Sequence, residues 1–316
     1  MGKIAVELEQ TLARRAASGA PGRTAGRLVA RGDGWSVEDV ICTFGPTDRP
    51  FEEQHSAESI GVVIAGTFEY RSALGRDLLT PGSLLLGHTG QCFECGHEHA
   101  AGDRCVAFRY APDYFERLAA DAGAPRGERT FRSSRLPPVR ELSPLVARAS
   151  TGVVAPMAGS WEELAIRVAH TAIGLAGGLP HDRARAPAGA VTRVTRSVRS
   201  IERDPGARWT LDRLAADARL SPFHYLRTFQ QLTGVTPHQF ILRARLREAA
   251  TRLTREKTKV IDIAFAAGFG DISNFNRSFR AEFGVAPAAY RRQVGKGDPA
   301  WNQPHCRRSP PGKAST

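Results

Sequence analysis

The sequence lacks a long hydrophobic run, which excludes a chain that crosses a membrane as a helix. Hydrophobic residues make up 41% of its 316 positions, yet no stretch approaches the ~18 consecutive apolar residues that span a bilayer. The first 18 residues carry charges throughout and lack the apolar segment of a secretory signal. We therefore expect a cytoplasmic protein without a membrane partner.

Cysteine is scarce, and the signatures of several enzyme classes are missing. The five cysteines are an odd number, and Cys92, Cys95 and Cys105 fall within fourteen residues. Reduced thiols or a metal site fit this pattern better than a disulfide framework. The sequence has no P-loop, nucleophile elbow or Rossmann glycine pattern. We predict that the protein is not an enzyme.

The positive charge of the chain is confined to one segment. The net charge is +12, and residues 190–316 hold 23 Lys and Arg against 10 Asp and Glu. The preceding 189 residues hold 21 basic and 22 acidic side chains. Such an asymmetry indicates a polyanionic partner for the C-terminal segment, with nucleic acid first and an anionic membrane second.

The pattern of the chain predicts an α+β protein with two domains. Residues 27–110 contain short apolar or β-branched runs separated by turn signals, at Ser36–Thr43, Ser59–Ile64, Thr67–Arg71, Ser83–Leu86 and Arg104–Arg109. They predict a small antiparallel barrel or sandwich. The strand and turn rhythm from His55 to Cys105, with Pro81-Gly82 before an apolar strand, resembles a cupin-like barrel.

Helices are predicted after the strands. They cover residues 112–121, 138–149 and 160–177, and they either pack on the barrel or form the seam of a homodimer; the sequence leaves the oligomeric state open. We expect an N-terminal domain over 1–178, a linker over 179–189, an all-α domain over 190–293 and a disordered tail over 294–316.

An internal repeat dominates the C-terminal third. Two series of residues follow the same order about fifty residues apart. The first series is Leu214-Ala215, a helix cap at Ser221, Phe229 and Gly234, and the second is Ile263-Ala264, a helix cap at Asp271, Phe279 and Gly284. The offset is 49 before the turn and 50 after it, so the second turn has one extra residue. Each unit reads as a helix-turn-helix whose second helix enters the major groove. A basic helix over 237–256 joins the two units.

These residues resemble the DNA-binding domain of the AraC/XylS family of transcription regulators. The match runs from about Val191 to Arg292, about a third of the chain. In the first unit it is carried by Leu214-Ala215, Ser221, Leu226-Arg227-Thr228-Phe229 and Gly234-Val235-Thr236-Pro237. In the second unit it is carried by Ile263-Ala264, Gly268-Phe269, Phe275-Asn276-Arg277-Ser278-Phe279, Phe283-Gly284-Val285-Ala286-Pro287 and Tyr290-Arg291. One departure is Arg219-Leu220, where a glycine is common. We therefore expect the first unit to turn less sharply.

The resemblance implies that the front of each second helix contacts DNA. The contact residues are Phe223, His224, Leu226 and Arg227 in the first unit, and Ser273, Asn274, Asn276 and Arg277 in the second. Arginine can pair with guanine and asparagine with adenine, while an apolar side chain can meet a thymine methyl. The alternative is that the two arginines contact only phosphates or brace a neighbouring helix.

A Cys/His motif is the second unusual feature. It comprises Cys92, Cys95, His97, His99 and Cys105, and thiolate and imidazole are ligands that zinc, copper and nickel prefer. In an extended chain positions 95, 97, 99 and 105 share a face, whereas 92 needs a bend. The motif leaves three interpretations open: a bound transition metal such as zinc as cofactor, a thiol redox sensor, and ordinary buried cysteines with a structural role. Cys42 and Cys306 fit no motif.

The predicted function is a sequence-specific transcription regulator that binds double-stranded DNA. Its N-terminal domain would respond to a small-molecule or metal effector, and RNA polymerase is a candidate partner. One alternative is a cupin-type metal-dependent enzyme that uses His55, His97 and His99 with Glu94 or Glu98. Nearby thiols are poor neighbours for oxygen chemistry, and a DNA-binding domain has no purpose in such an enzyme. The other alternative is a DNA-binding protein without a sensor.

Overall fold

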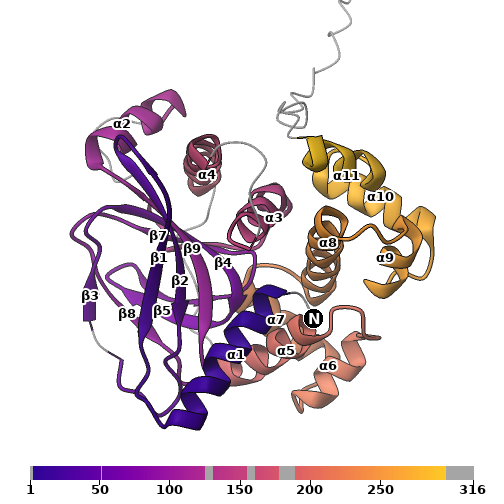
Figure 1. Ribbon diagram of the computed structural model, residues 1–316. Helices are drawn as coiled ribbons and strands as arrows, with labels where there is room; N and C mark the ends of the chain where they lie inside the picture. Colours follow the sequence, from indigo (N-terminus) through magenta and orange to yellow (C-terminus); the bar gives the residue numbers. More distant parts are fainter. Residues whose placement is uncertain (1–2, 51, 125–130, 155–160, 178–188, 297–316) are drawn as a thin grey trace, which may run out of the picture.

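The protein has an N-terminal part built on two antiparallel sheets and a C-terminal part made of helices (Figure 1). The computed structural model describes residues 3–50, 52–124, 131–154, 161–177 and 189–296. The α+β class expected from the sequence is confirmed. Of the predicted linker only Gly189 is described, and of the predicted tail only residues 294–296, which extend the last helix.

The larger sheet has six strands. In spatial order they are β1 (Thr24–Gly32), β2 (Trp35–Cys42), β9 (Asp103–Tyr110), β4 (Glu58–Gly66), β7 (Leu84–Gly87) and β10 (Arg135–Leu136). The smaller sheet has the order β3 (Glu52–Gln54), β8 (Cys92–Gly96), β5 (Phe68–Ser72) and β6 (Gly75–Leu79). Among the described strands no ladder joins the two sheets, so the expected barrel is not closed.

The two faces of the larger sheet have different partners. Val63 of β4 and Leu85 of β7 pack with Phe68 and Tyr70 of β5, which forms a small core between the sheets. On the opposite face, alternate side chains such as Phe108 pack against α2 (Pro112–Asp121), α3 (Ser143–Gly152) and α4 (Trp161–Ala176). The helices expected after the strands therefore pack on the sheet, the first of the two arrangements considered.

Every strand and helix predicted for the N-terminal part has a counterpart in the structure. The five predicted strands match β2, β4, β5, β7 and β9 within two residues, and α2 has both predicted ends. The helix predicted over 138–149 begins later, at Ser143, because Pro144 occupies its first turn and a short 3-10 turn, Arg140–Leu142, precedes it. Helix α1 (Lys3–Ser18) and the strands β1, β3, β6 and β10 were not predicted, and β8 was considered as a strand only for the Cys/His motif.

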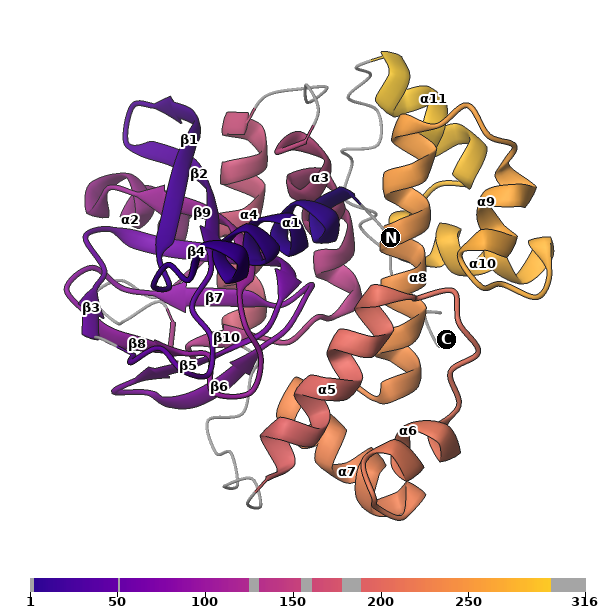
Figure 2. The ribbon, with the colours of Figure 1, turned by 60° about the horizontal axis from the view of Figure 1, so that its bottom comes forward.

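The C-terminal part contains seven helices within the described residues: α5 (Ala190–Arg203), α6 (Leu211–Asp217), α7 (Pro222–Thr233), α8 (Pro237–Arg255), α9 (Val260–Ala266), α10 (Ile272–Phe283) and α11 (Pro287–Lys296). Figure 2 shows α8 between two groups of helices, with α5, α6 and α7 near one end and α9, α10 and α11 near the other. Four residues separate α6 from α7 and five separate α9 from α10, which confirms the extra residue in the second turn.

The two parts pack directly on each other. Helix α3 contacts both α8 and α10, and α7 contacts β6. Leu78 of β6 is buried in the core of the first helical unit, and Ala147 of α3 in the core of the second. Arg135 joins the parts by donating from Nη1 to the carbonyl oxygens of Leu78 (3.0 Å) and Leu232 (2.7 Å). A change in the N-terminal part can therefore reach the helical units through direct contacts.

Candidate functional site

Helix α7 presents its front turn to solvent. Ser221 caps the helix by accepting a hydrogen bond from the His224 amide (3.3 Å), and Gly234 ends it with a φ of 80°. Tyr225 and Phe229 are fully buried in the core of the unit, as expected from their helical spacing. Phe223 is 74% exposed, an unusual position for a large apolar side chain.

Helix α10 repeats this design in the second unit. The Asp271 carboxylate accepts a hydrogen bond from the backbone N–H of Asn274 (2.6 Å), and Phe275 and Phe279 are fully buried. Arg277 donates from Nη2 to Oδ1 of Asn274 (3.2 Å), so two predicted contact residues hold each other in place on the surface.

The eight predicted DNA-contact residues all lie on the front turns of α7 and α10. Seven of them are exposed and Leu226 is half-buried. These side chains remain exposed although the N-terminal part packs on the helical units. The two front turns therefore offer polar, cationic and apolar side chains to a partner, and their contact with DNA stays a prediction.

The arginines of α8 are engaged within the protein. Arg243 pairs with Glu282 (3.3 Å), Arg245 donates to the carbonyl oxygens of Pro205 and Ala207, and Arg255 donates to that of Val154. These ion pairs and hydrogen bonds connect α8 to neighbouring segments of the protein. The positive charge of this helix in the sequence does not form a stripe facing solvent.

The Cys/His motif does not form one cluster. Cys92 is exposed at the start of β8, whereas Cys95 points between the sheets, where Cys105 also packs against the small core. His97 and His99 follow β8 in the connection to β9, so the predicted strand parity does not extend to them. His99 lies with Nδ1 3.1 Å from Oγ1 of Thr192 in α5.

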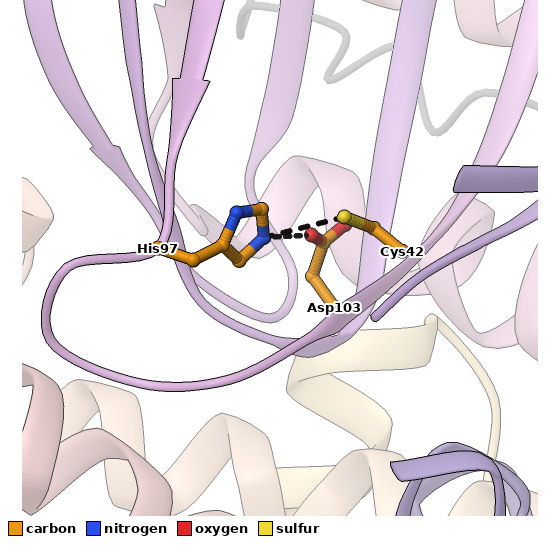
Figure 3. A group of neighbouring side chains, drawn as sticks. All are labelled: Cys42, His97 and Asp103. Atoms are coloured by element: carbon orange, nitrogen blue, oxygen red, sulfur yellow. Dashed lines mark hydrogen bonds and ion pairs between the residues drawn. The ribbon is translucent and has the colours of Figure 1, made fainter. Parts of the chain in front are cut away.

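One residue of that motif belongs to a different cluster, formed with Cys42 and Asp103 (Figure 3). Nε2 of His97 lies 2.7 Å from Oδ2 of Asp103 and 3.6 Å from Sγ of Cys42. The three residues are only 5–7% exposed. Among the described residues, these three side chains form the group that could hold a metal ion, because their ligand atoms lie within 4.8 Å of one another.

Cys42 and Asp103 were not among the metal ligands predicted from the sequence. Strand pairing brings them together, because Cys42 at the end of β2 lies opposite Asp103 at the start of β9, and Val40 lies opposite Cys105. Residues opposite each other in an antiparallel pair share a face. The alternating pattern of β2 and β9 shows which face each residue occupies, but no local signal shows that these two strands are neighbours.

The cluster is not arranged as a cysteine nucleophile with its base. In such a site the histidine faces the thiol with one ring nitrogen and the carboxylate with the other. Here Nε2 faces both partners, and Nδ1 has no hydrogen-bond partner among the described residues. Burial and the nearby Asp103 carboxylate raise the pKa of the Cys42 thiol well above its usual value, which disfavours a free thiolate.

The three histidines of the enzyme alternative lie in separate surroundings. His55 stacks on Phe93 and lies with Nε2 2.8 Å from the Tyr70 hydroxyl. Burial lowers the pKa of His55 to about 4, so its ring is neutral at physiological pH. His97 belongs to the cluster with Cys42, and His99 lies against α5. The three histidines therefore do not converge on one metal as the enzyme alternative requires.

A cavity of about 1350 Å³ opens on the N-terminal part. It lies between β8 and α2, and its lining includes Arg71, His88, Phe93, Phe115 and Arg117. Apolar rings beside a few charged groups are typical of a small-molecule pocket.

None of the helices in the described residues is both long and apolar enough to traverse a bilayer.

Comparison with known proteins identifies the helical region. A family described as a helix-turn-helix domain matches residues 214–293. The RCS-specific transcriptional activator RclR of Escherichia coli is 36% identical over 90 residues, 28% of this chain and 32% of RclR. The regulator MtrA of Neisseria gonorrhoeae is 27% identical over 104 residues, 33% of this chain and 35% of MtrA. The matched segment thus spans about a third of the length of each relative.

Solved structures are also similar to part of this chain. A transcriptional regulator from Chromobacterium violaceum, described as containing an AraC-type DNA-binding domain, is 25% identical, with a TM-score of 0.32, and the alignment covers 35% of this chain and 98% of that one.

Proposed function

Because residues 214–293 of this chain are a helix-turn-helix domain of the AraC type, we propose that the protein is a transcription regulator that binds specific DNA sequences. The observation that carries the proposal is the pair of exposed front turns on α7 and α10. Both helices begin at a side-chain cap, end at a glycine in the left-handed conformation and keep their aromatic face buried.

The helix α8 gives the two units a fixed separation. Its 19 residues span about 28 Å at ~1.5 Å per residue, close to the ~34 Å between successive major-groove faces. A capping box between Thr236 and Gln239 fixes the start of this helix. A single chain would thus read two adjacent segments of the major groove.

The N-terminal part would act as the sensor in this proposal. Its close packing on α7, α8 and α10 supports coupling between an effector and the DNA-binding units. The effector would be a small molecule in the cavity beside α2 or a metal ion in the protein interior. The protein would work in the cytoplasm, with RNA polymerase as a further partner and with a homodimer as one arrangement on DNA.

Selection of bound DNA from a random pool with the full chain tests the proposal. We expect one enriched motif with two parts about 10 base pairs apart, one for each unit. Enrichment of no common sequence would instead indicate a DNA-binding protein without site selection and would contradict the proposal.

Substitution of Arg277 then tests base recognition. We expect Arg277→Ala to reduce discrimination at one position of the selected site by ~1–3 kcal/mol. Arg280→Ala is the matched control, because this exposed arginine lies one turn further from the front of α10 and should change affinity without changing preference. If Arg277→Ala weakens all sequences equally, Arg277 contacts only phosphate.

A further inference from the structure

The cluster of Cys42, His97 and Asp103 contains the donor atoms of a transition-metal site. A thiol sulfur, an imidazole nitrogen and a carboxylate oxygen lie within 4.8 Å of one another and come from the end of β2 and from residues 97–103. Ligands of one zinc ion, each at ~2.0–2.3 Å from it, are about 3.4 Å apart in a tetrahedron. The 3.6 Å between Cys42 and His97 fits this spacing, and the 2.7 Å between His97 and Asp103 needs to open by under ~1 Å.

The surroundings of the cluster suit a bound ion. The rings of Phe44 and Phe68 stack against His97, with centroids 6.3 and 6.1 Å away. Sγ of Cys105 lies 3.4 Å from Oδ1 of Asp103, the oxygen that does not face His97. A mixed sulfur, nitrogen and oxygen set selects zinc or a similar transition ion over magnesium or calcium, which prefer oxygen alone.

We propose that Cys42, His97 and Asp103 bind one transition-metal ion of the zinc class, and that this ion sets the position of residues 97–103 against α5. His97 directly follows β8 and Asp103 begins β9, so an ion that joins them to Cys42 fixes both ends of the connection between these strands.

The same short connection contacts the DNA-binding part. Between its two ligands, His99 lies 3.1 Å from Thr192, and Arg199 of α5 donates to the carbonyl oxygens of Ala101 (2.9 Å) and Gly102. Arg199 also donates from Nε to Oγ1 of Thr67 (3.2 Å), the residue before β5. Metal binding would thus act directly on the surface that holds α5.

Helix α5 continues this contact into the first DNA-binding unit. Val194, Val198 and Ile201 on its buried face belong to the same core as Tyr225 and Phe229 of α7. A shift of residues 97–103 therefore changes how α7 is held. This consequence rests on the proposed function, whereas metal binding itself does not.

Metal binding is tested with the reduced full chain, without a histidine tag, by titration with zinc and with cobalt(II) as a spectroscopic probe. We expect one equivalent to bind, with a thiolate-to-cobalt charge-transfer band. Cys42→Ser and His97→Gln should each weaken binding more than ~100-fold, beyond the 10- to 100-fold typical of outer-shell changes. Cys92→Ser is the matched control and should bind as the wild type does, because Cys92 is exposed and lies outside the cluster.

Two outcomes would overturn the metal site. One is no stoichiometric binding to the wild type. The other is binding that Cys92→Ser abolishes and Cys42→Ser retains, which would assign the metal to the Cys92 and Cys95 pair. Thermal unfolding with and without zinc separates loss of binding from loss of folding, because a folded variant without the site melts cooperatively and gains nothing from zinc.

The link to α5 is tested by DNA affinity on the selected site. We expect zinc to change the affinity of the wild type at least ~5-fold. Arg199→Met should bind zinc normally and show less than a twofold effect. An unchanged DNA affinity in the wild type, with zinc bound, would contradict the link. Failure to bind any DNA would contradict the proposed function and leave the metal titration as an independent result.

Discussion

Arg219 has the only positive φ of a residue other than glycine in the described part of the chain, at 54°. It occupies the position that Gly268 has in the second unit. The turn hydrogen bonds are the same in both units: Arg219 and Leu220 donate to Ala216 and Ala215, as Gly268 and Phe269 donate to Phe265 and Ala264. The expectation of a less sharp first turn is therefore wrong, because the arginine adopts the strained conformation.

Replacing Arg219 with glycine should stabilise the protein. A left-handed residue with a Cβ costs ~1–2 kcal/mol, and part of that gain is lost because glycine is more flexible in the unfolded chain. We expect Arg219→Gly to raise the free energy of unfolding by ~0.5–1 kcal/mol, measured by chemical denaturation.

Gly268→Ala provides the reciprocal experiment. At this position a Cβ would lie 2.7 Å from the Gly206 carbonyl oxygen, and the φ is 88°. We expect a loss of more than ~1 kcal/mol, since strain and steric conflict act together. Equal effects of the two substitutions on stability would contradict this interpretation of the turns.

At the scale of elements, the caps of α7 and α10 place the predicted contact residues. Ser221 and Asp271 each satisfy the amide of the residue three positions later, His224 and Asn274. Both caps could be predicted because they depend on local sequence. The end of β8 could not be predicted in this way. The strand alternation that was expected to place His97 and His99 on one face therefore does not apply, because β8 ends before both residues.

Removing the cap of α10 should weaken both folding and DNA binding. We expect Asp271→Ala to lower the free energy of unfolding by ~1 kcal/mol, and to lower DNA affinity because the turn that carries Asn274 and Arg277 loosens. Asp271→Asn keeps a cap acceptor and should retain most of the stability. Equal losses for the two variants in denaturant titrations would show that charge, and not the cap, matters.

At the scale of the whole molecule, the junction of the two parts contains half-buried charges. Glu202 of α5 faces Arg199, Arg247, Glu9 and the backbone amide of Gly66. Burial raises its pKa to about 7, although the arginines oppose the shift. Burial also lowers the pKa of Arg247 to about 10, which leaves it cationic at physiological pH. The protonation of Glu202 therefore changes within the physiological range.

This shift predicts a pH dependence of stability. The pKa of Glu202 in the folded protein lies above the ~4.3 of a free glutamate, so the folded state binds the proton more tightly. The resulting stabilisation is complete below about pH 4 and is lost as the pH rises through 7. Between pH 6 and 8 the wild type should lose about 1 kcal/mol relative to Glu202→Gln, measured by denaturation.

Glu116→Gln is the control for this measurement. Glu116 is exposed on α2, so the variant should follow the pH profile of the wild type. A profile of Glu202→Gln parallel to that of the wild type between pH 6 and 8 would contradict the assignment to Glu202.

The sequence by itself determined the tandem helical units, their caps, their buried aromatic faces and the residues on their front turns. All of these depend on helical periodicity and on side chains three or four residues apart, which are local properties of a chain. The helices after the strands, and the strands with one buried face, followed from the same kind of pattern.

Only the tertiary structure decided which residues form the buried cluster and what the arginines of α8 do. Cys42 meets Asp103 and His97 because β2 pairs with β9 and because β8 ends before His97. Arg243 meets Glu282 because α8 and α10 pack together. Such contacts depend on which strands and helices become neighbours, and that choice is made by the packing of the whole chain rather than by any short segment of it.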